Sequence, residues 1–167
     1  MSYSLTVFVN DQSAITPELL AETYKRYYRL DPFVSIHSCP EGFKEQGEDE
    51  PAVIVTIPLV EGDSDAFAYT GEFANKWLII IRFMREKMHP DDKKRILSKA
   101  RNPLKRSQIA ACNRWIYITT SPDPELWYVN EYIYTLQILD EFRGLYVFSD
   151  NENKFLSHIC EYAQKPS

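Results

Sequence analysis

The alternation of apolar and polar positions is strongest between Arg114 and Asp150. Trp115, Tyr117 and Thr119 alternate with Ile116 and Ile118, which is the period of a β-strand, and residues 145–148 form a continuous apolar run. Between these segments an apolar stripe recurs at helical spacing, made of Leu126, Val129, Tyr132, Ile133, Leu136 and Leu139. Asp123 is suited to cap a helix that begins at Pro124, and Gly144 to end it in a left-handed conformation. The pattern predicts a βαβ unit with two parallel strands.

The first 60 residues predict the order β-α-β-β. A strand is expected over residues 3–9, and Thr16 before Pro17 begins a helix that Pro32 stops. A short strand is expected over residues 33–37 and a stronger one over residues 52–60, where Pro58 belongs at an edge or a bulge. This order fits either half of a ferredoxin-like arrangement or one wing of a larger mixed sheet.

Three further segments are predicted to be helical. Over residues 73–88 the apolar positions fit helical spacing, although residues 79–81 are three isoleucines that also fit a strand. A short helix is expected from Asp91 to Ala100, and a final helix from Lys154 to Tyr162. Together these elements predict one domain over residues 1–167. Its expected class is α/β, with α+β as the alternative, built on a mixed sheet of about five strands with helices packed on it.

Charge is distributed unevenly along the chain, whose net charge is −5. Residues 82–106 contain ten Lys or Arg against three acids, whereas residues 41–65 contain eight acids against one lysine. Such polarity can steer a charged partner to one face, and it is also compatible with two solvated surfaces. An anion-binding site for a small ligand or RNA would use the basic residues Lys93, Lys94, Arg95, Lys99, Arg101, Lys105 and Arg106. The acidic total argues against general nucleic-acid binding.

Composition and the N-terminal residues favour a cytoplasmic protein. The first residues lack the basic region and small-residue cleavage site of a signal peptide, and no apolar run is long enough to span a membrane. Cys39, Cys112 and Cys160 are an odd number without CxxC spacing, which favours reduced thiols. We therefore expect neither a disulfide framework nor a membrane contact.

Candidate catalytic and metal-binding residues are few. The predicted strand ends bring together Asp123 and Asp150, which could serve a small hydrolase or a nucleotide-processing enzyme. Asp123 with Glu152 and Lys154 matches a nuclease-type pattern only superficially, because the expected elements differ. His37 with Cys39, and His158 with Cys160, are residue types that bind zinc, but the second pair diverges on a helix. We predict no metal site, no cofactor and no catalytic set.

Eleven tyrosines are the more unusual feature, because large rings with a polar tip suit protein interfaces as well as cores. Trp127, Tyr128 and Tyr134 are expected at or beyond the margin of the apolar stripe. With the acidic loops they form the predicted partner-binding set, which comprises Glu48, Asp49, Glu50, Asp63, Asp65, Trp127, Tyr128 and Tyr134.

The acidic loops GFKEQGEDE (42–50) and EGDSD (61–65), together with the aromatic segment WYVNEYIY (127–134), make the chain similar in type to small acidic bacterial immunity proteins. That resemblance implies a cytoplasmic protein that neutralises a cognate toxin by direct binding. It transfers no functional residue, and the basic segment 82–106 departs from it. The leading hypothesis is a non-enzymatic protein-binding module. The strand-end enzyme and the anion or RNA binder are its alternatives, and a homo-oligomer remains open.

Overall fold

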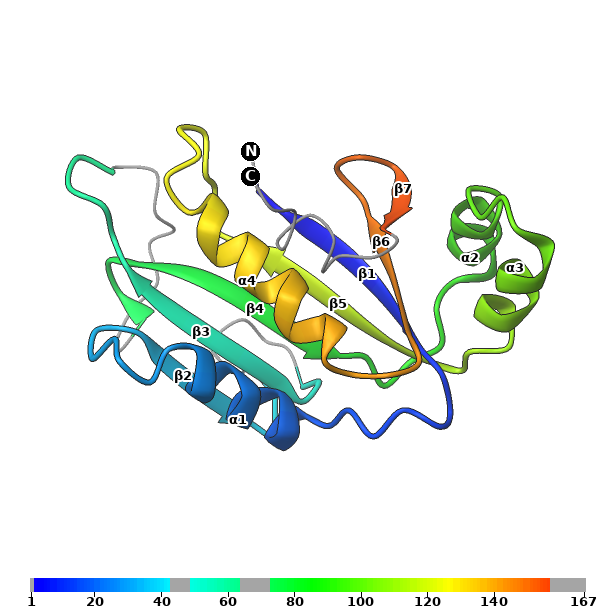
Figure 1. Ribbon diagram of the computed structural model, residues 1–167, viewed down its shortest axis with the longest axis horizontal. Coiled ribbons are helices and arrows are strands. Elements are labelled where there is room, and N and C mark those ends of the chain that lie inside the picture. The colour runs from blue at the N-terminus through cyan, green and yellow to red at the C-terminus, as the bar shows by residue number, and fades with distance from the viewer. Residues whose placement is uncertain (1, 43–48, 64–72, 157–167) are drawn as a thin grey trace, which may run out of the picture.

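The computed structural model describes residues 2–42, 49–63 and 73–156, which form four helices and one seven-stranded sheet (Figure 1). The strands are β1 (Ser4–Val9), β2 (Ser35–Cys39), β3 (Ala52–Pro58), β4 (Lys76–Phe83), β5 (Arg114–Thr120), β6 (Leu145–Ser149) and β7 (Lys154–Leu156). The helices are α1 (Pro17–Tyr27), α2 (Pro90–Leu97), α3 (Pro103–Ala110) and α4 (Val129–Asp140). No helix in these ranges is long and apolar enough to cross a membrane.

The sheet has the order β2-β3-β4-β5-β1-β6-β7, and every neighbouring pair is antiparallel. The first strand of the chain therefore lies inside the sheet, where Thr6 stands opposite both Tyr117 of β5 and Phe148 of β6. The protein is an α+β domain with two more strands than the five expected.

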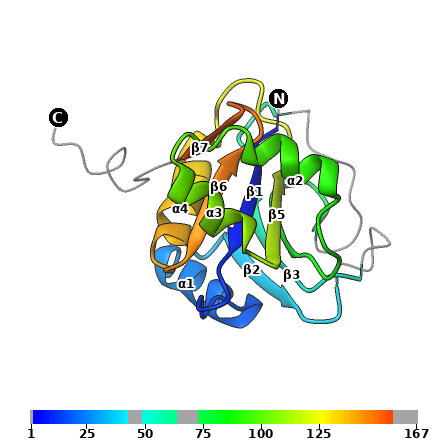
Figure 2. The same ribbon diagram turned by 90° about the vertical axis from the view of Figure 1, so that its right-hand side faces the viewer.

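Helices cover the two faces unequally. α1 and α4 lie side by side on one face, over a core that includes Val7, Ile79 and Ile118 (Figure 1). α2 and α3 lie at one end of the molecule (Figure 2) and pack against Phe8 and Phe148, which point to the opposite face. The core thus extends to both sides of β1 and β6.

Local capping signals account for several element boundaries. The Thr16 hydroxyl accepts the Leu19 N–H at 3.2 Å and begins α1, as its sequence predicts. Gly144 has φ +78° before β6, the predicted left-handed conformation, in which a larger residue would be strained. The Asn102 side chain accepts the Leu104 and Lys105 N–H groups and begins α3, a helix that the pattern did not predict.

The predicted parallel βαβ unit is wrong in its pairing. β5 and β6 run in the same direction, and α4 connects them, but β1 is inserted between them and pairs antiparallel with both. The apolar run of β6 is buried because α4 covers one face and the α2–α3 pair the other, so burial on two faces did not require parallel neighbours.

The helix expected over residues 73–88 is also wrong, because residues 76–83 form β4. Ile79 and Ile81 point to the α1–α4 core, while Ile80 points to a second cluster with Ile54 and Phe73. A strand covered on both faces has no alternating pattern, so its apolar positions can imitate helical spacing.

Two other helix boundaries differ from expectation. Residues 154–156 form β7 rather than the start of a helix, because Phe155 packs edge-on against Phe148 with ring centroids 5.1 Å apart. The rest of that expected helix lies outside the described residues. The central helix begins at Val129, not Pro124. Its buried side is centred on Thr135, Ile138 and Leu139, so Leu126 and Ile133 of the predicted stripe are exposed.

Candidate functional site

Asp123 organises the loop between β5 and α4. Its side chain is only 1% exposed and accepts three hydrogen bonds, from the Tyr3 hydroxyl at 2.7 Å, the Trp127 N–H at 2.7 Å and the Tyr128 N–H at 3.1 Å. The carboxylate therefore satisfies backbone N–H groups of this loop. It is not the predicted helix cap, because α4 begins at Val129 and its N-cap residue, Tyr128, makes no side-chain capping bond. The carboxylate also ties this loop to the beginning of the chain.

A stack of aromatic rings lies beneath the same loop. The ring of Trp77 stacks on Tyr128 with centroids 4.6 Å apart, and its Nε1–H donates to the Pro122 carbonyl at 3.0 Å. The Tyr128 hydroxyl donates to Asp63 Oδ2 at 2.7 Å and accepts the Val60 N–H at 2.9 Å. Burial, followed by the Asp63 bond, raises the pKa of Tyr128 to about 12. This stack joins the loop after β3 to the loop before α4.

Exposed apolar side chains surround this joined pair of loops. Ten large hydrophobic residues are exposed among the described ones, and two of them, Leu19 and Leu104, lie elsewhere. The other eight lie where α1 ends, β3 ends and α4 begins, at the left-hand end in Figure 1. We call them the aromatic end: Tyr27, Leu30, Phe33, Val60, Leu126, Trp127, Ile133 and Tyr134.

Leu126 combines a strained backbone conformation with an exposed side chain. Leu126 has φ +60°, a left-handed conformation that costs a residue with a Cβ roughly 1–2 kcal/mol. It is nonetheless 54% exposed, so burial of its side chain within the chain offsets this cost only in part. The Asp123 hydrogen bonds to the next two residues hold the turn in place. Strain of this kind is concentrated at binding and catalytic sites.

Tyrosines of α1 and α4 form the lower part of the aromatic end. The ring of Tyr134 lies 6.4 Å from that of Tyr27 and 5.9 Å from that of Tyr28, measured between centroids. The Tyr28 side chain is buried, and its hydroxyl makes no hydrogen bond with the described residues. Burial, then the charge of Glu131, raises the Tyr28 pKa.

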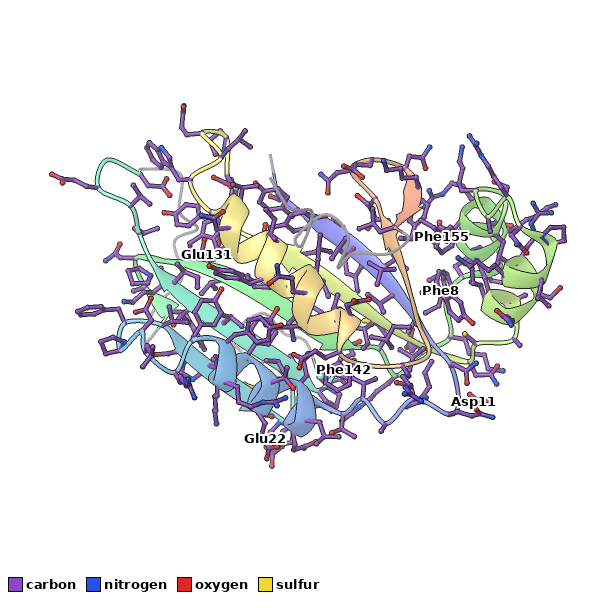
Figure 3. The ribbon with its side chains drawn as sticks, in the orientation of Figure 1. Phe8, Asp11, Glu22, Glu131, Phe142 and Phe155 are labelled. Carbon is purple, nitrogen blue, oxygen red and sulfur yellow. The ribbon has the colours of Figure 1, made fainter. Side chains whose placement is uncertain are left out.

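Glu131 is a half-buried carboxyl on the same helix (Figure 3). Burial, then the negative charges of Asp31 and Asp123, raises its pKa. Folding therefore favours the protonated form, and ionisation at neutral pH opposes folding.

We expect Glu131→Gln to melt at a higher temperature than the native protein at pH 7. The folded protein binds the Glu131 proton more tightly than the unfolded chain, so stability falls as pH rises between the ordinary carboxyl pKa and the raised one. The difference between variant and native should shrink as pH falls to about 4, near the pKa of an unperturbed glutamate. Thermal melts from pH 4 to 8 measure it. Glu22→Gln, on the exposed side of α1 (Figure 3), is the control, and the same pH dependence in both variants would contradict the assignment.

The structure brings together part of the predicted partner-binding set. Asp63 reaches Tyr128, and the side chains of Trp127 and Tyr134 are exposed nearby. Tyr128 itself is buried, so its predicted role at the partner surface is wrong: its ring belongs to the core. Asp49 and Glu50 precede β3, whereas Asp63 follows it, so they lie at opposite ends of that strand. Glu48 and Asp65 lie outside the described residues.

The sequence missed Tyr27, Leu30 and Phe33. Tyr24, Tyr27 and Tyr28 lie close together in the sequence, but only Tyr24 and Tyr28, four residues apart, are buried, and Tyr27 is exposed. Leu30 and Phe33 are 88% and 70% exposed in the loop after α1. Large apolar residues in a polar loop beside prolines were the available signal.

Asp123 and Asp150 do not form a common site. The Asp150 carboxylate accepts the Ser4 hydroxyl at 2.7 Å and the Thr6 hydroxyl at 3.1 Å, whereas Asp123 accepts that of Tyr3. Successive side chains of an extended chain point to opposite faces, so the two carboxylates lie on opposite faces of the sheet. The geometry expected for a strand-end enzyme is absent.

The basic residues divide into structural and available groups. Lys93 Nζ donates to the carbonyls of Ala110 and Cys112, and the Arg106 guanidinium donates to that of Ala100, so both hold the α2–α3 pair together. The remaining members of the predicted set are exposed on or between the two helices: Lys94, Arg95, Lys99, Arg101 and Lys105.

Only one of the two candidate zinc-binding pairs lies in the part of the chain that the structure describes. His37 and Cys39 lie on β2, while His158 and Cys160 lie outside the described residues. Across the described ranges, no three His, Cys, Asp or Glu side chains are grouped as a metal site requires.

No family model matches the chain, and no curated protein or solved structure matches it either. Any functional proposal therefore depends on the residues of this chain.

Proposed function

We propose that the protein is a non-enzymatic protein-binding module whose partner docks on the aromatic end. The observation that carries the proposal is the gathering of eight of the ten exposed large hydrophobic residues at one end of the described chain. Exposed apolar surface is costly in water, and where such side chains gather at one end of a protein they indicate an interaction site. Tyrosine and tryptophan are the residue types that contribute most to such interfaces.

Part of this surface is acidic, which favours a basic partner there. Asp31, Asp63 and Glu131 lie next to the exposed rings, and the loop segments 57–63 and 119–128 contain no lysine or arginine, whereas Lys25, Arg26 and Arg29 lie beside Tyr27 in the sequence. A lysine or arginine of the partner could contact the faces of Tyr27 and Tyr134 while pairing with Glu131. Pairing with a cation would also offset the cost of ionising Glu131. An immunity protein that neutralises a basic toxin domain is the form of this proposal that the bacterial resemblance favours.

Affinity capture with matched surface variants tests the proposal. Leu126→Gly removes an exposed side chain where glycine relieves backbone strain, so its stability should be unchanged or higher by up to about 1 kcal/mol. Tyr134→Ser removes an exposed ring of α4. Leu104→Ser, on the distant α3, removes a comparably exposed apolar side chain and serves as the control.

The expected result is a stoichiometric basic protein bound by the native chain and by Leu104→Ser, with capture by the other two variants reduced about tenfold. Native mass spectrometry at low and moderate salt gives the stoichiometry. Equal capture by all four proteins would show that the partner docks elsewhere. If the native protein instead forms a homodimer, and the same two substitutions dissociate it, then the partner is a second copy of the chain and not a different protein.

A further inference from the structure

A cleft of about 610 Å³ lies between the α2–α3 pair, the end of α4 and the strands β6 and β7. Its lining elements α3, β6 and β7 lie away from the aromatic end (Figure 1). Its volume is in the range of small-molecule sites. Phe142 and Phe155, both labelled in Figure 3, line it.

The lining has two chemically distinct parts. Aliphatic side chains from four different elements contribute the first part: Ile109, Leu139, Leu145, Val147 and Leu156. Cationic side chains contribute the second: Lys99, Arg101, Lys105 and Lys154. One carboxylate, Asp140, lies among them. The cleft therefore combines an apolar wall with an excess of positive charge.

Three of the four cations are not neutralised by the fold. Lys154 lies 3.6 Å from Glu152, but Lys99, Arg101 and Lys105 form no ion pair and no side-chain hydrogen bond with another described residue. By contrast, Lys93 and Arg106 on the same helices are bound to carbonyls. Like charges held close together repel one another and raise the local concentration of anions.

We propose that this cleft binds an anionic amphiphile, with an acyl or alkyl chain against the apolar wall and a carboxylate or phosphate headgroup among Lys99, Arg101 and Lys105. An inorganic anion would leave the apolar wall in water, and a neutral hydrocarbon would leave the three cations unpaired. Only a ligand that has both an apolar chain and an anionic group matches the apolar wall and the three cations. Lysine and arginine form their strongest hydrogen bonds with such oxyanions. The proposal is independent of the docking of a protein on the aromatic end.

Isothermal titration calorimetry of the full chain tests the proposal with four probes below their micelle concentrations. Decanoate and decyl phosphate carry both features and distinguish the headgroup, decanol lacks the charge, and inorganic phosphate lacks the chain. We expect saturable one-to-one binding of at least one of the first two, weakened by added salt, and about tenfold weaker binding of decanol and inorganic phosphate.

Charge-matched variants locate the site. Lys99→Gln with Lys105→Gln removes two cations of the cleft, and Lys25→Gln with Lys87→Gln removes two exposed lysines outside it. The first pair should lower the affinity about tenfold and the second should leave it nearly unchanged. The absence of saturable binding by decanoate and decyl phosphate would overturn the proposal, and so would equal binding of decanol or an equal loss in both double variants.

Discussion

Asp123→Ala is expected to lower the free energy of unfolding by at least about 3 kcal/mol. The substitution leaves two buried donors, the Tyr3 hydroxyl and the Tyr128 N–H, and one partly buried donor, the Trp127 N–H, without an acceptor, and each unsatisfied buried donor costs roughly 1–3 kcal/mol. For a chain of this length the melting temperature should fall by about 10 °C. Urea unfolding followed by circular dichroism measures the change.

Asp150→Ala is the matched control. Asp150 also accepts hydrogen bonds from hydroxyls, those of Ser4 and Thr6, but it is partly exposed, so water can replace the carboxylate. We expect a loss of about 1 kcal/mol. Similar losses in the two variants would mean that Asp123 does not organise the loop. The two variants also distinguish a structural carboxylate from a catalytic one. If the carboxylate is structural, any loss of function in its variant is explained by the loss of stability.

Trp77→Ala should have the other large effect, a loss of about 4 kcal/mol. Its ring is fully buried, stacks on Tyr128 and meets Tyr3 edge-on at 6.5 Å between centroids. Removing it opens a cavity below both loops of the aromatic end. Hydrogen exchange should therefore increase most in residues 58–63 and 121–128, before the rest of the sheet is affected.

Trp77→Phe separates the ring from its hydrogen bond. Phenylalanine keeps an aromatic ring against Tyr128 but leaves the Pro122 carbonyl without the Nε1–H donor. We expect a loss of about 1–2 kcal/mol beyond any packing adjustment. If the phenylalanine variant were as unstable as the alanine variant, the hydrogen bond rather than the stack would support these loops.

The two predictions concern one network that supports the proposed binding surface. Asp123 fixes the turn at Leu126 and Trp127, and Trp77 with Tyr128 fixes the loop that carries Val60 and Asp63. A preorganised surface loses less conformational entropy when a partner docks. The buried residues of this network therefore act on binding through position, while the exposed side chains would make the contacts.

Elements with a complete local signal were predicted from the sequence. β5 alternates because one of its faces is more deeply buried, and Thr16 with Pro17 marks the start of α1 by backbone chemistry alone. The same holds for the left-handed turn at Gly144. Where burial on both faces removed the alternation, as in β4, the local pattern was ambiguous and the prediction of a helix was wrong.

The sequence alone determined which short segments can form strands, caps and turns, because these depend on residues within about one turn of the chain. The tertiary structure decided that β1 lies between β5 and β6, that Tyr128 is buried while Tyr27 and Tyr134 are exposed, and that Asp123 and Asp150 face opposite sides. Tyr3 and Asp123 are 120 residues apart. Strand order and the faces that the helices cover decide which tyrosines and carboxylates of the chain come into contact. No local sequence pattern encodes the strand order or the covered faces.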